Sequence, residues 1–120
     1  MTYKAKQGDV VWLDFDPSKG HEIRKRCPAV VLSSNAYNRA TGFVIVSPIT
    51  STIRSLPGYV DIVSNKIRGQ VVTSQVYSLD VTEQGNRKID FIERMNIEDF
   101  YTVAQFTKMN FDFKFSLVTV

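Results

Sequence analysis

A short basic segment near the N-terminus carries three kinds of side chain that can act on a phosphodiester. Glu22 can accept a proton, and His21, whose ordinary pKa lies near neutrality, can donate one. The run Arg24-Lys25-Arg26 follows and offers N–H donors for phosphate oxygens. Acid–base cleavage of a phosphodiester needs these functions: proton removal, proton donation and stabilisation of charge on the phosphate. The segment is therefore the first candidate for a functional site.

Each of these residues also has a structural interpretation. Glu22 can form an ion pair with Arg24 or Arg26, His21 can be an ordinary exposed histidine, and three adjacent basic residues are usually a solvated face. Thr50, which follows a predicted strand, is of a residue type that commonly caps the following turn. The residue types alone leave both interpretations open.

The composition limits the kind of protein. A chain of 120 residues is expected to form a single domain over 1–120. With 43% hydrophobic residues, 22% charged residues and no apolar run long enough to span a membrane, we expect a cytoplasmic protein without a secretory signal. The single cysteine excludes an internal disulfide and argues against a structural zinc site.

The charge is unevenly distributed along the chain. Residues 1–68 hold ten Lys and Arg against five Asp and Glu, whereas residues 69–120 hold five against seven. A phosphate-bearing partner is therefore expected at the first half, unless the excess only forms a solvated surface.

Short apolar runs separated by Gly, Pro and Asn predict the strands that must position these residues. Six strands and a connector at Ser34–Gly42 are expected before residue 94. The predicted strands are Gly8–Phe15, Ala29–Ser33, Phe43–Ser47, Tyr59–Val63, Gln70–Leu79 and Asn86–Glu93.

The period of the sequence changes after the sixth run. Asn96 is a candidate N-cap with acidic residues in the turn behind it, and a helix is expected to follow. Its predicted apolar face consists of Ile97, Phe100, Tyr101, Ala104 and Phe111. Alternating apolar residues over Phe111–Leu117 predict a final strand. The fold class is mainly β with added helices: a small barrel of five to seven strands with a C-terminal helix.

The stretch from Gly8 to Glu22 resembles the opening of the MazF/PemK toxins, whose pattern is G-[DE]-[IVL]-[VWI]-W-[VL]-x-[FL]-[DP]-P-[ST]-x-G-x-E. Every specified position agrees. The resemblance continues through residues 28–33, 46–51 and 75–80, in the order and at the spacing of the family. It therefore covers residues 8–80 and is more specific than any single motif.

This resemblance implies an SH3-like barrel and the toxin of a type II toxin–antitoxin system. Such toxins are homodimeric endoribonucleases that cleave single-stranded mRNA without metal or other cofactor. The ribose 2′-hydroxyl attacks the adjacent phosphate and leaves a 2′,3′-cyclic phosphate and a 5′-hydroxyl. A cognate antitoxin inhibits them by placing an extended tail in the RNA groove, and DNA is bound only through the antitoxin complex.

Roles for individual residues follow partly from the resemblance, for Glu22 and Thr50, and partly from side-chain chemistry, for His21 and Arg26. Glu22 takes part in acid–base chemistry, with His21 as a candidate proton donor, and Thr50 hydrogen-bonds the scissile phosphate. Arg26 is expected to stabilise charge on that phosphate. The expected RNA-binding residues are Lys19, Gly20, Arg24, Lys25, Ser51, Thr52, Gln75 and Tyr77.

Cys27 is the main departure from the family, which normally has a catalytic arginine directly before the proline. A thiol carries no fixed positive charge, so Arg26 or Arg24 must stabilise the phosphate, or else catalysis is impaired. Loss of one such donor lowers rates about 100–1,000-fold in other enzymes. We therefore also consider an impaired module that binds RNA or its antitoxin without cutting, and hypothesise that Cys27 is an inactivating change.

Two further departures lie near the end of the matched region. Ser74 stands where the family usually has an acidic residue, and Tyr77 where it has a basic one. Tyr77 can stack on a base, but an aromatic side chain in a strand more often belongs to the core or a dimer interface. The gyrase-poisoning toxins share the barrel but act through a C-terminal Trp-Gly-Ile, which this chain lacks because its one tryptophan is Trp12.

Overall fold

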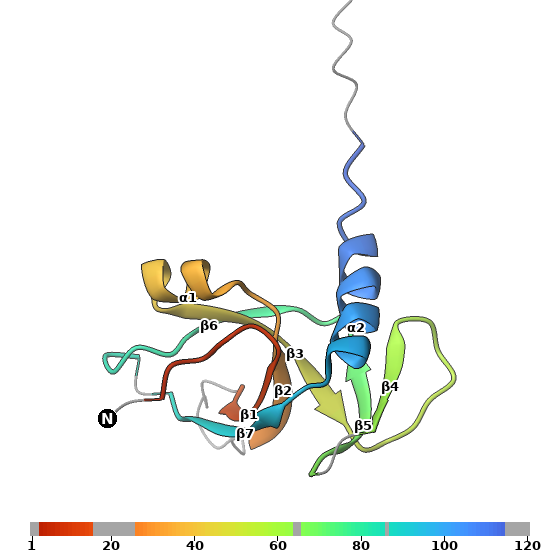
Figure 1. Ribbon diagram of the computed structural model, residues 1–120, viewed down its shortest axis with the longest axis horizontal. Helices are drawn as coiled ribbons and strands as arrows, with labels where there is room; N and C mark the ends of the chain where they lie inside the picture. Colours follow the sequence, from red (N-terminus) through yellow and green to blue (C-terminus); the bar gives the residue numbers. More distant parts are fainter. Residues whose placement is uncertain (1–2, 16–25, 64–65, 86, 115–120) are drawn as a thin grey trace, which may run out of the picture.

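Seven strands form one strongly curled sheet in the computed structural model, which describes residues 3–15, 26–63, 66–85 and 87–114 (Figure 1). The order is β4-β5-β3-β2-β1-β7, and β6 pairs with β3 outside that path. The predicted class, a mainly β barrel-type fold with a C-terminal helix, is confirmed. The elements are β1 (Asp9–Asp14), β2 (Arg26–Val31), α1 (Asn35–Thr41), β3 (Phe43–Thr50), β4 (Tyr59–Val63), β5 (Arg68–Val72), β6 (Tyr77–Asp80), β7 (Ile89–Arg94) and α2 (Ile97–Met109).

β3 is the longest strand and is shared by three neighbours. One edge pairs with β2, while the other pairs with β6 along its first half and with β5 at Ile49 and Thr50. The predicted single strand Gln70–Leu79 is therefore wrong: it is two strands joined by a turn. The turn is held because Thr73 donates its N–H and its hydroxyl to Gly58 O, at 2.9 and 2.7 Å.

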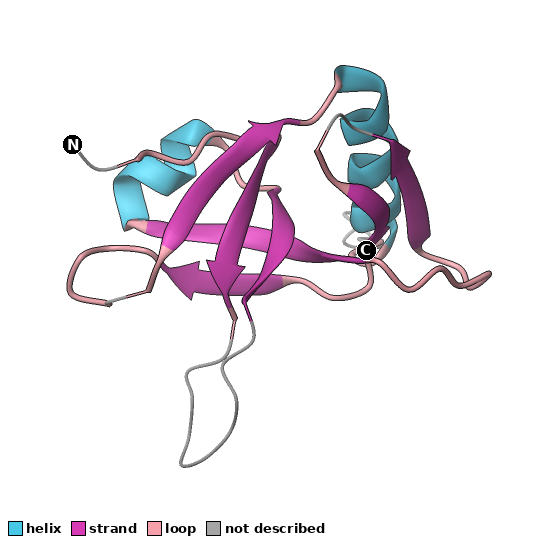
Figure 2. Ribbon diagram, turned by 90° about the horizontal axis from the view of Figure 1, so that it is seen from below, coloured by secondary structure: helices cyan, strands magenta, loops and turns pink. Residues whose placement is uncertain are grey.

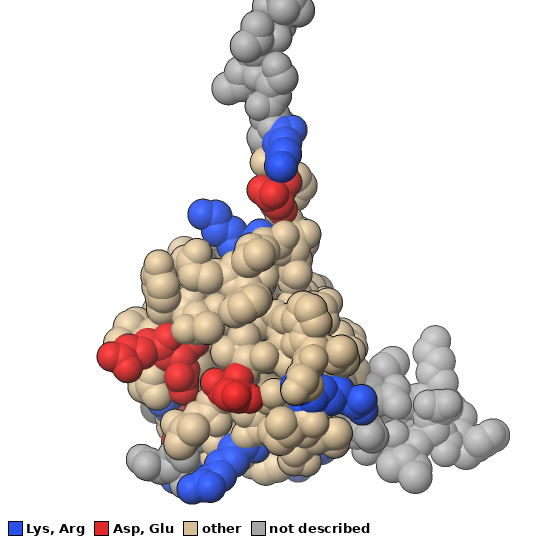
Figure 3. Space-filling view, turned by 90° about the vertical axis from the view of Figure 1, so that its right-hand side faces the viewer, with Lys and Arg blue, Asp and Glu red and all other residues tan. Residues whose placement is uncertain are grey.

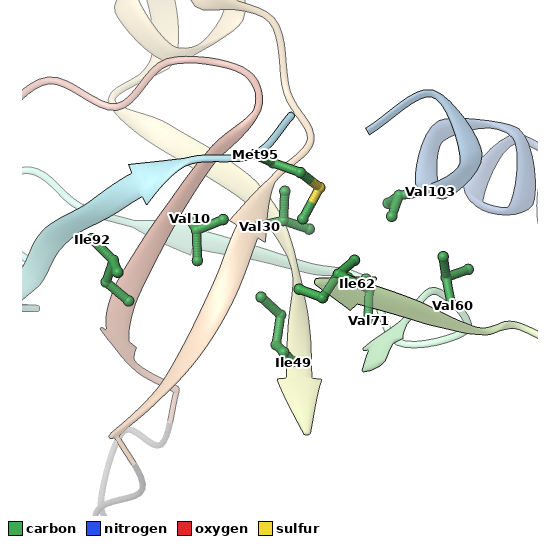
Figure 4. Close-up of a cluster of buried hydrophobic side chains, with 9 residues drawn as sticks. All are labelled: Val10, Val30, Ile49, Val60, Ile62, Val71, Ile92, Met95 and Val103. Atoms are coloured by element: carbon green, nitrogen blue, oxygen red, sulfur yellow. The ribbon is translucent and has the colours of Figure 1, made fainter. Parts of the chain in front are cut away.

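Two hydrophobic clusters lie on opposite faces of the curled sheet, which is why β1 and β2 are apolar at consecutive positions. The first lies between the sheet and α2, where side chains from six strands and the helix converge on one space (Figure 4). Val10 and Val30 belong to this cluster, whereas Val11 and Ala29 belong to the second. Figure 2 shows the β4–β5 hairpin beside α2, at an angle to the central strands.

The predicted connector at residues 34–42 needs correction, whereas the predicted start of the C-terminal helix is confirmed. The expected connector at Ser34–Gly42 contains α1, which begins after the N-cap Ser34 and ends at Gly42, whose φ of 74° suits a left-handed C-cap. In α2 the cap at Asn96 is as predicted, since its side chain accepts the Asp99 N–H at 2.8 Å.

The predicted apolar face of α2 is only partly correct. Val103 is fully buried and Phe100 packs against the same cluster, but Ile97 and Tyr101 are 77% and 64% exposed. Val103 is the buried residue of α2, so one narrow stripe of the helix surface is covered. Figure 3 shows broad uncharged areas on this side of the molecule.

The C-terminal prediction differs from the structure in its described part. Residues 111–114 are exposed and do not form a strand; the remainder of the expected strand Phe111–Leu117 lies outside the described residues. Among the described helices, none has the length and apolar character to cross a membrane.

The buried carboxylate of Asp9 ties β1 to β7 and to the N-terminal segment. It accepts hydrogen bonds from the Tyr3 hydroxyl, from the Lys6 N–H at 3.0 Å and from Arg94 Nη1 at 3.1 Å. Burial, together with the bond to Asp9, raises the pKa of Tyr3 well above its ordinary value. The acidic position of the N-terminal motif thus has a structural role.

Candidate functional site

A cavity of about 730 Å³ opens where β1, β2 and the end of β3 meet the β4–β5 hairpin. Its size is within the range of small-molecule and cofactor sites. It brings together five residues selected from the sequence, which come from three separate segments of the chain. These residues are Cys27, Thr50, Ser51, Thr52 and Gln75.

Thr50 is the last residue of β3 and lines the cavity. Its Oγ1 accepts the Thr52 N–H at 3.1 Å, which is the turn-capping bond considered from the sequence. A hydroxyl also has one hydrogen to donate. The cap therefore leaves that hydrogen available for an oxyanion in the cavity.

Cys27 and Arg26 are placed differently although they are adjacent. Both belong to β2, the strand that was expected over Ala29–Ser33. Cys27 lines the cavity, whereas Arg26 pairs with Asp90 and lies over the Trp12 ring, 6.0 Å from its centroid. Trp12 itself lines the cavity, so Arg26 packs on a residue of the cavity wall without lining it.

Tyr77 lies beside the cavity and does not line it. Its ring packs edge-on against Phe15 with the centroids 5.1 Å apart, and its hydroxyl donates to Gln75 Oε1 at 3.3 Å. The Gln75 backbone is fixed in turn, because its carbonyl accepts the Ser47 hydroxyl at 2.8 Å. The ring of Tyr77 therefore has the packing role considered from the sequence, and its hydroxyl helps to orient Gln75, which lines the cavity.

Three basic residues of the cavity were not selected from the sequence: Arg54, Lys66 and Arg68. They lie in the basic first part of the chain, so the charge asymmetry was the signal that could have found them. No Asp or Glu is among the described lining residues. The described wall of the cavity is consequently cationic, which favours a phosphate-bearing ligand.

The remaining candidates lie outside the described residues. They are Lys19, Gly20, His21, Glu22, Arg24 and Lys25. Within the described ranges, no group of three or more His, Cys, Asp or Glu side chains is placed to hold a metal ion.

This chain is similar to proteins of known family and structure. Residues 6–105 match a family described as the PemK-like, MazF-like toxin of type II toxin–antitoxin systems. The endoribonuclease toxin MazF of Escherichia coli strain K12 is 36% identical over 86 residues, which are 72% of this chain and 78% of that protein.

Solved structures from Deinococcus radiodurans have a similar fold. The crystal structure of its MazF superposes with a TM-score of 0.76 and 30% identity, covering 90% of this chain and 96% of that one. A chain from a crystal structure of its MazE–MazF complex gives a TM-score of 0.77 and 29% identity, with the same coverage of 90% and 96%.

Proposed function

Because this chain belongs to the PemK-like, MazF-like toxins of type II toxin–antitoxin systems, we propose that it is an endoribonuclease that cleaves single-stranded RNA without a metal ion. The observation that carries the proposal is the cavity that Thr50 lines together with the basic residues Arg54, Lys66 and Arg68. Proteins similar to this chain include the endoribonuclease MazF toxin of Escherichia coli.

The reaction begins at the ribose. The 2′-hydroxyl attacks the adjacent phosphorus, the bond to the 5′-oxygen breaks, and the products are a 2′,3′-cyclic phosphate and a 5′-hydroxyl. Glu22 takes the 2′-hydroxyl proton and His21 protonates the leaving 5′-oxygen. Thr50 donates its hydrogen to a non-bridging phosphate oxygen, since its own oxygen already accepts the Thr52 N–H.

RNA binding uses the rest of the cavity. Ser51, Thr52 and Gln75 offer donors and acceptors to phosphates or to unstacked base edges. Lys19, Gly20, Arg24 and Lys25 extend the contact along the backbone, and Tyr77 contributes through Gln75. We propose a short sequence motif as the target, because base edges are read only where the strand is unpaired.

The partners follow from the same proposal. The chain acts in the cytoplasm as a homodimer and is neutralised by a cognate antitoxin whose extended tail occupies the RNA groove; DNA is reached only through that complex. Similarity to a chain of a MazE–MazF complex supports the antitoxin partner.

The test is to incubate RNA with the purified protein in excess EDTA and to sequence the new ends. Cleavage should persist and leave cyclic phosphates. Thr50→Val should lower the rate about 100-fold, whereas Thr102→Val, at an exposed position of α2, should leave it unchanged. Complete loss of cleavage in EDTA, restored by added metal, would contradict a metal-free route.

A second candidate is a toxin-like module that binds RNA or antitoxin and cleaves poorly. It is favoured by Cys27 in the cavity wall and by the pairing of Arg26, which does not line the cavity, with Asp90. Under this hypothesis Cys27→Arg accelerates cleavage about 100-fold or more. A variant no faster than the parent chain would rule out impairment at this position.

A further inference from the structure

Two arginines of the cavity have guanidinium groups without a partner among the residues that the structure describes. Arg54 and Arg68 are exposed and line the cavity, and within the described residues neither side chain forms a hydrogen bond or an ion pair. The third cation is partly engaged, because Lys66 Nζ donates to the Ile92 carbonyl at 3.4 Å. Among the described residues, the charges of these two arginines are therefore not paired with another side chain.

The strand register places Arg68 close to Thr50. Thr50 pairs with Gln70 across β3 and β5, and Arg68 lies two residues from Gln70, so its side chain points to the same face. Such diagonal neighbours lie about 7–8 Å apart, within reach of a long side chain. An arginine on this wall can thus contact the same phosphate as the Thr50 hydroxyl.

Close contacts at Gly69 and Gln70 fix where Arg68 and Arg54 lie relative to the end of β3. Gly69 lies against the Thr50 carbonyl so closely that a Cβ on it would stand 2.2 Å from that oxygen. Gln70 holds the other arginine, because its Oε1 accepts the Arg54 N–H at 2.9 Å and its Nε2 donates to Arg54 O at 3.0 Å. Two segments that carry arginine are thereby held against the end of β3.

We propose that Arg68, assisted by Arg54, is the phosphate-binding group that provides the positive charge missing at position 27. This inference rests on the proposed ribonuclease function and specifies how RNA is held in this chain. The site takes the phosphodiester backbone of single-stranded RNA, with a guanidinium from the β4–β5 hairpin on one side of the phosphate and Thr50 on the other. A guanidinium suits this role because its paired N–H groups match two phosphate oxygens.

The experiment measures binding separately from cleavage. A fluorescent single-stranded RNA with 2′-O-methyl riboses has no attacking hydroxyl, and its affinity is followed by anisotropy at several salt concentrations. Arg68→Gln and Arg54→Gln are compared with Arg39→Gln, which removes an exposed arginine of α1 outside the cavity. Arg68→Lys retains the charge without the planar fork, and urea unfolding verifies that each variant is folded.

We expect Arg68→Gln to weaken binding about tenfold at low salt, as for one charged hydrogen bond. The slope of log affinity against log salt should fall by about 0.7, the value for one phosphate contact on a single strand. The affinity of Arg68→Lys should lie between those of the parent chain and Arg68→Gln, and the affinity of Arg39→Gln should equal that of the parent chain. Adding Cys27→Arg to Arg68→Gln should recover most of the lost affinity.

The two proposals fail in different ways. If Arg68→Gln and Arg54→Gln bind like Arg39→Gln, or if the parent chain does not bind the analogue, the phosphate site is overturned, whatever the cleavage assay gives. If binding depends on Arg68 but neither the parent chain nor Cys27→Arg cleaves unmodified RNA, the ribonuclease function is overturned and the phosphate site stands.

Discussion

Gln70 connects the cavity to the stability of the fold, and Gln70→Met tests how strongly. Methionine has a similar length but offers no comparable donor or acceptor. The change removes the two bonds to the Arg54 backbone and the bond from Nε2 to Asp61 Oδ1 at 2.8 Å. A neutral hydrogen bond contributes about 1 kcal/mol net and one to a charged group about 1.5–3 kcal/mol.

The groups left behind determine how much of this is lost. Arg54 and Asp61 are exposed, so water can replace part of each lost bond, and we expect a net loss of about 2 kcal/mol in the free energy of unfolding. With an m-value of about 2 kcal/mol/M, the urea midpoint falls by about 1 M. The fluorescence of Trp12, the only tryptophan, follows the transition.

Gln105→Met is the matched control, because Gln105 is exposed on α2 and methionine has a similar helix propensity. It should change stability by less than about 0.5 kcal/mol. Hydrogen exchange at the Arg54 amide should accelerate only in Gln70→Met. A stability equal to that of the control, or unchanged exchange at Arg54, would refute the view that Gln70 anchors this wall.

Three further substitutions test other parts of the structure. Gly69→Ala would place its Cβ 2.2 Å from Thr50 O at a φ of +151°, so we expect a loss of about 2 kcal/mol or more by urea unfolding, together with slower RNA cleavage; parental values would contradict this. Val103→Ala removes a fully buried side chain and should cost about 2 kcal/mol; a loss below about 0.5 kcal/mol would mean that α2 is not docked as described. The Thr82 hydroxyl and N–H donate to Asp80 and lower the pKa of its carboxyl, so their stabilisation is present at neutral pH and is lost as the pH falls through that lowered pKa. In Thr82→Ala, NMR titration should find the pKa of Asp80 raised towards its ordinary value, and an unchanged midpoint would disprove the hydroxyl's contribution.

The strands were predictable because apolar runs between turn residues specify where strands occur. The prediction at Tyr59–Val63 agrees with β4 residue by residue. The break between β5 and β6 was not predictable, since it depends on the bonds of Thr73 to Gly58, a residue 15 positions away. The buried stripe of α2 was also missed, because helical spacing does not indicate which of two adjoining stripes faces the sheet.

Some residues of the candidate site were likewise predictable from the sequence, and others were not. The position of Thr50 at the end of a strand follows from sequence and motif, and the structure places it in the cavity with Cys27 and Gln75. The contribution of Arg68 depends on the register between β3 and β5, which no local pattern specifies. Arg26 shows the converse: its type suits phosphate, but its side chain pairs with Asp90 and does not line the cavity.

The pairing of β1 with β7 has a consequence for how the chain folds. β1 lies inside the sheet, and the edge opposite β2 is covered only by residues about 80 positions later in the chain. Contacts between such distant segments close large loops and slow folding. During synthesis, the first strand therefore presents an open edge, prone to pairing with other chains, until nearly all of the sheet has been made.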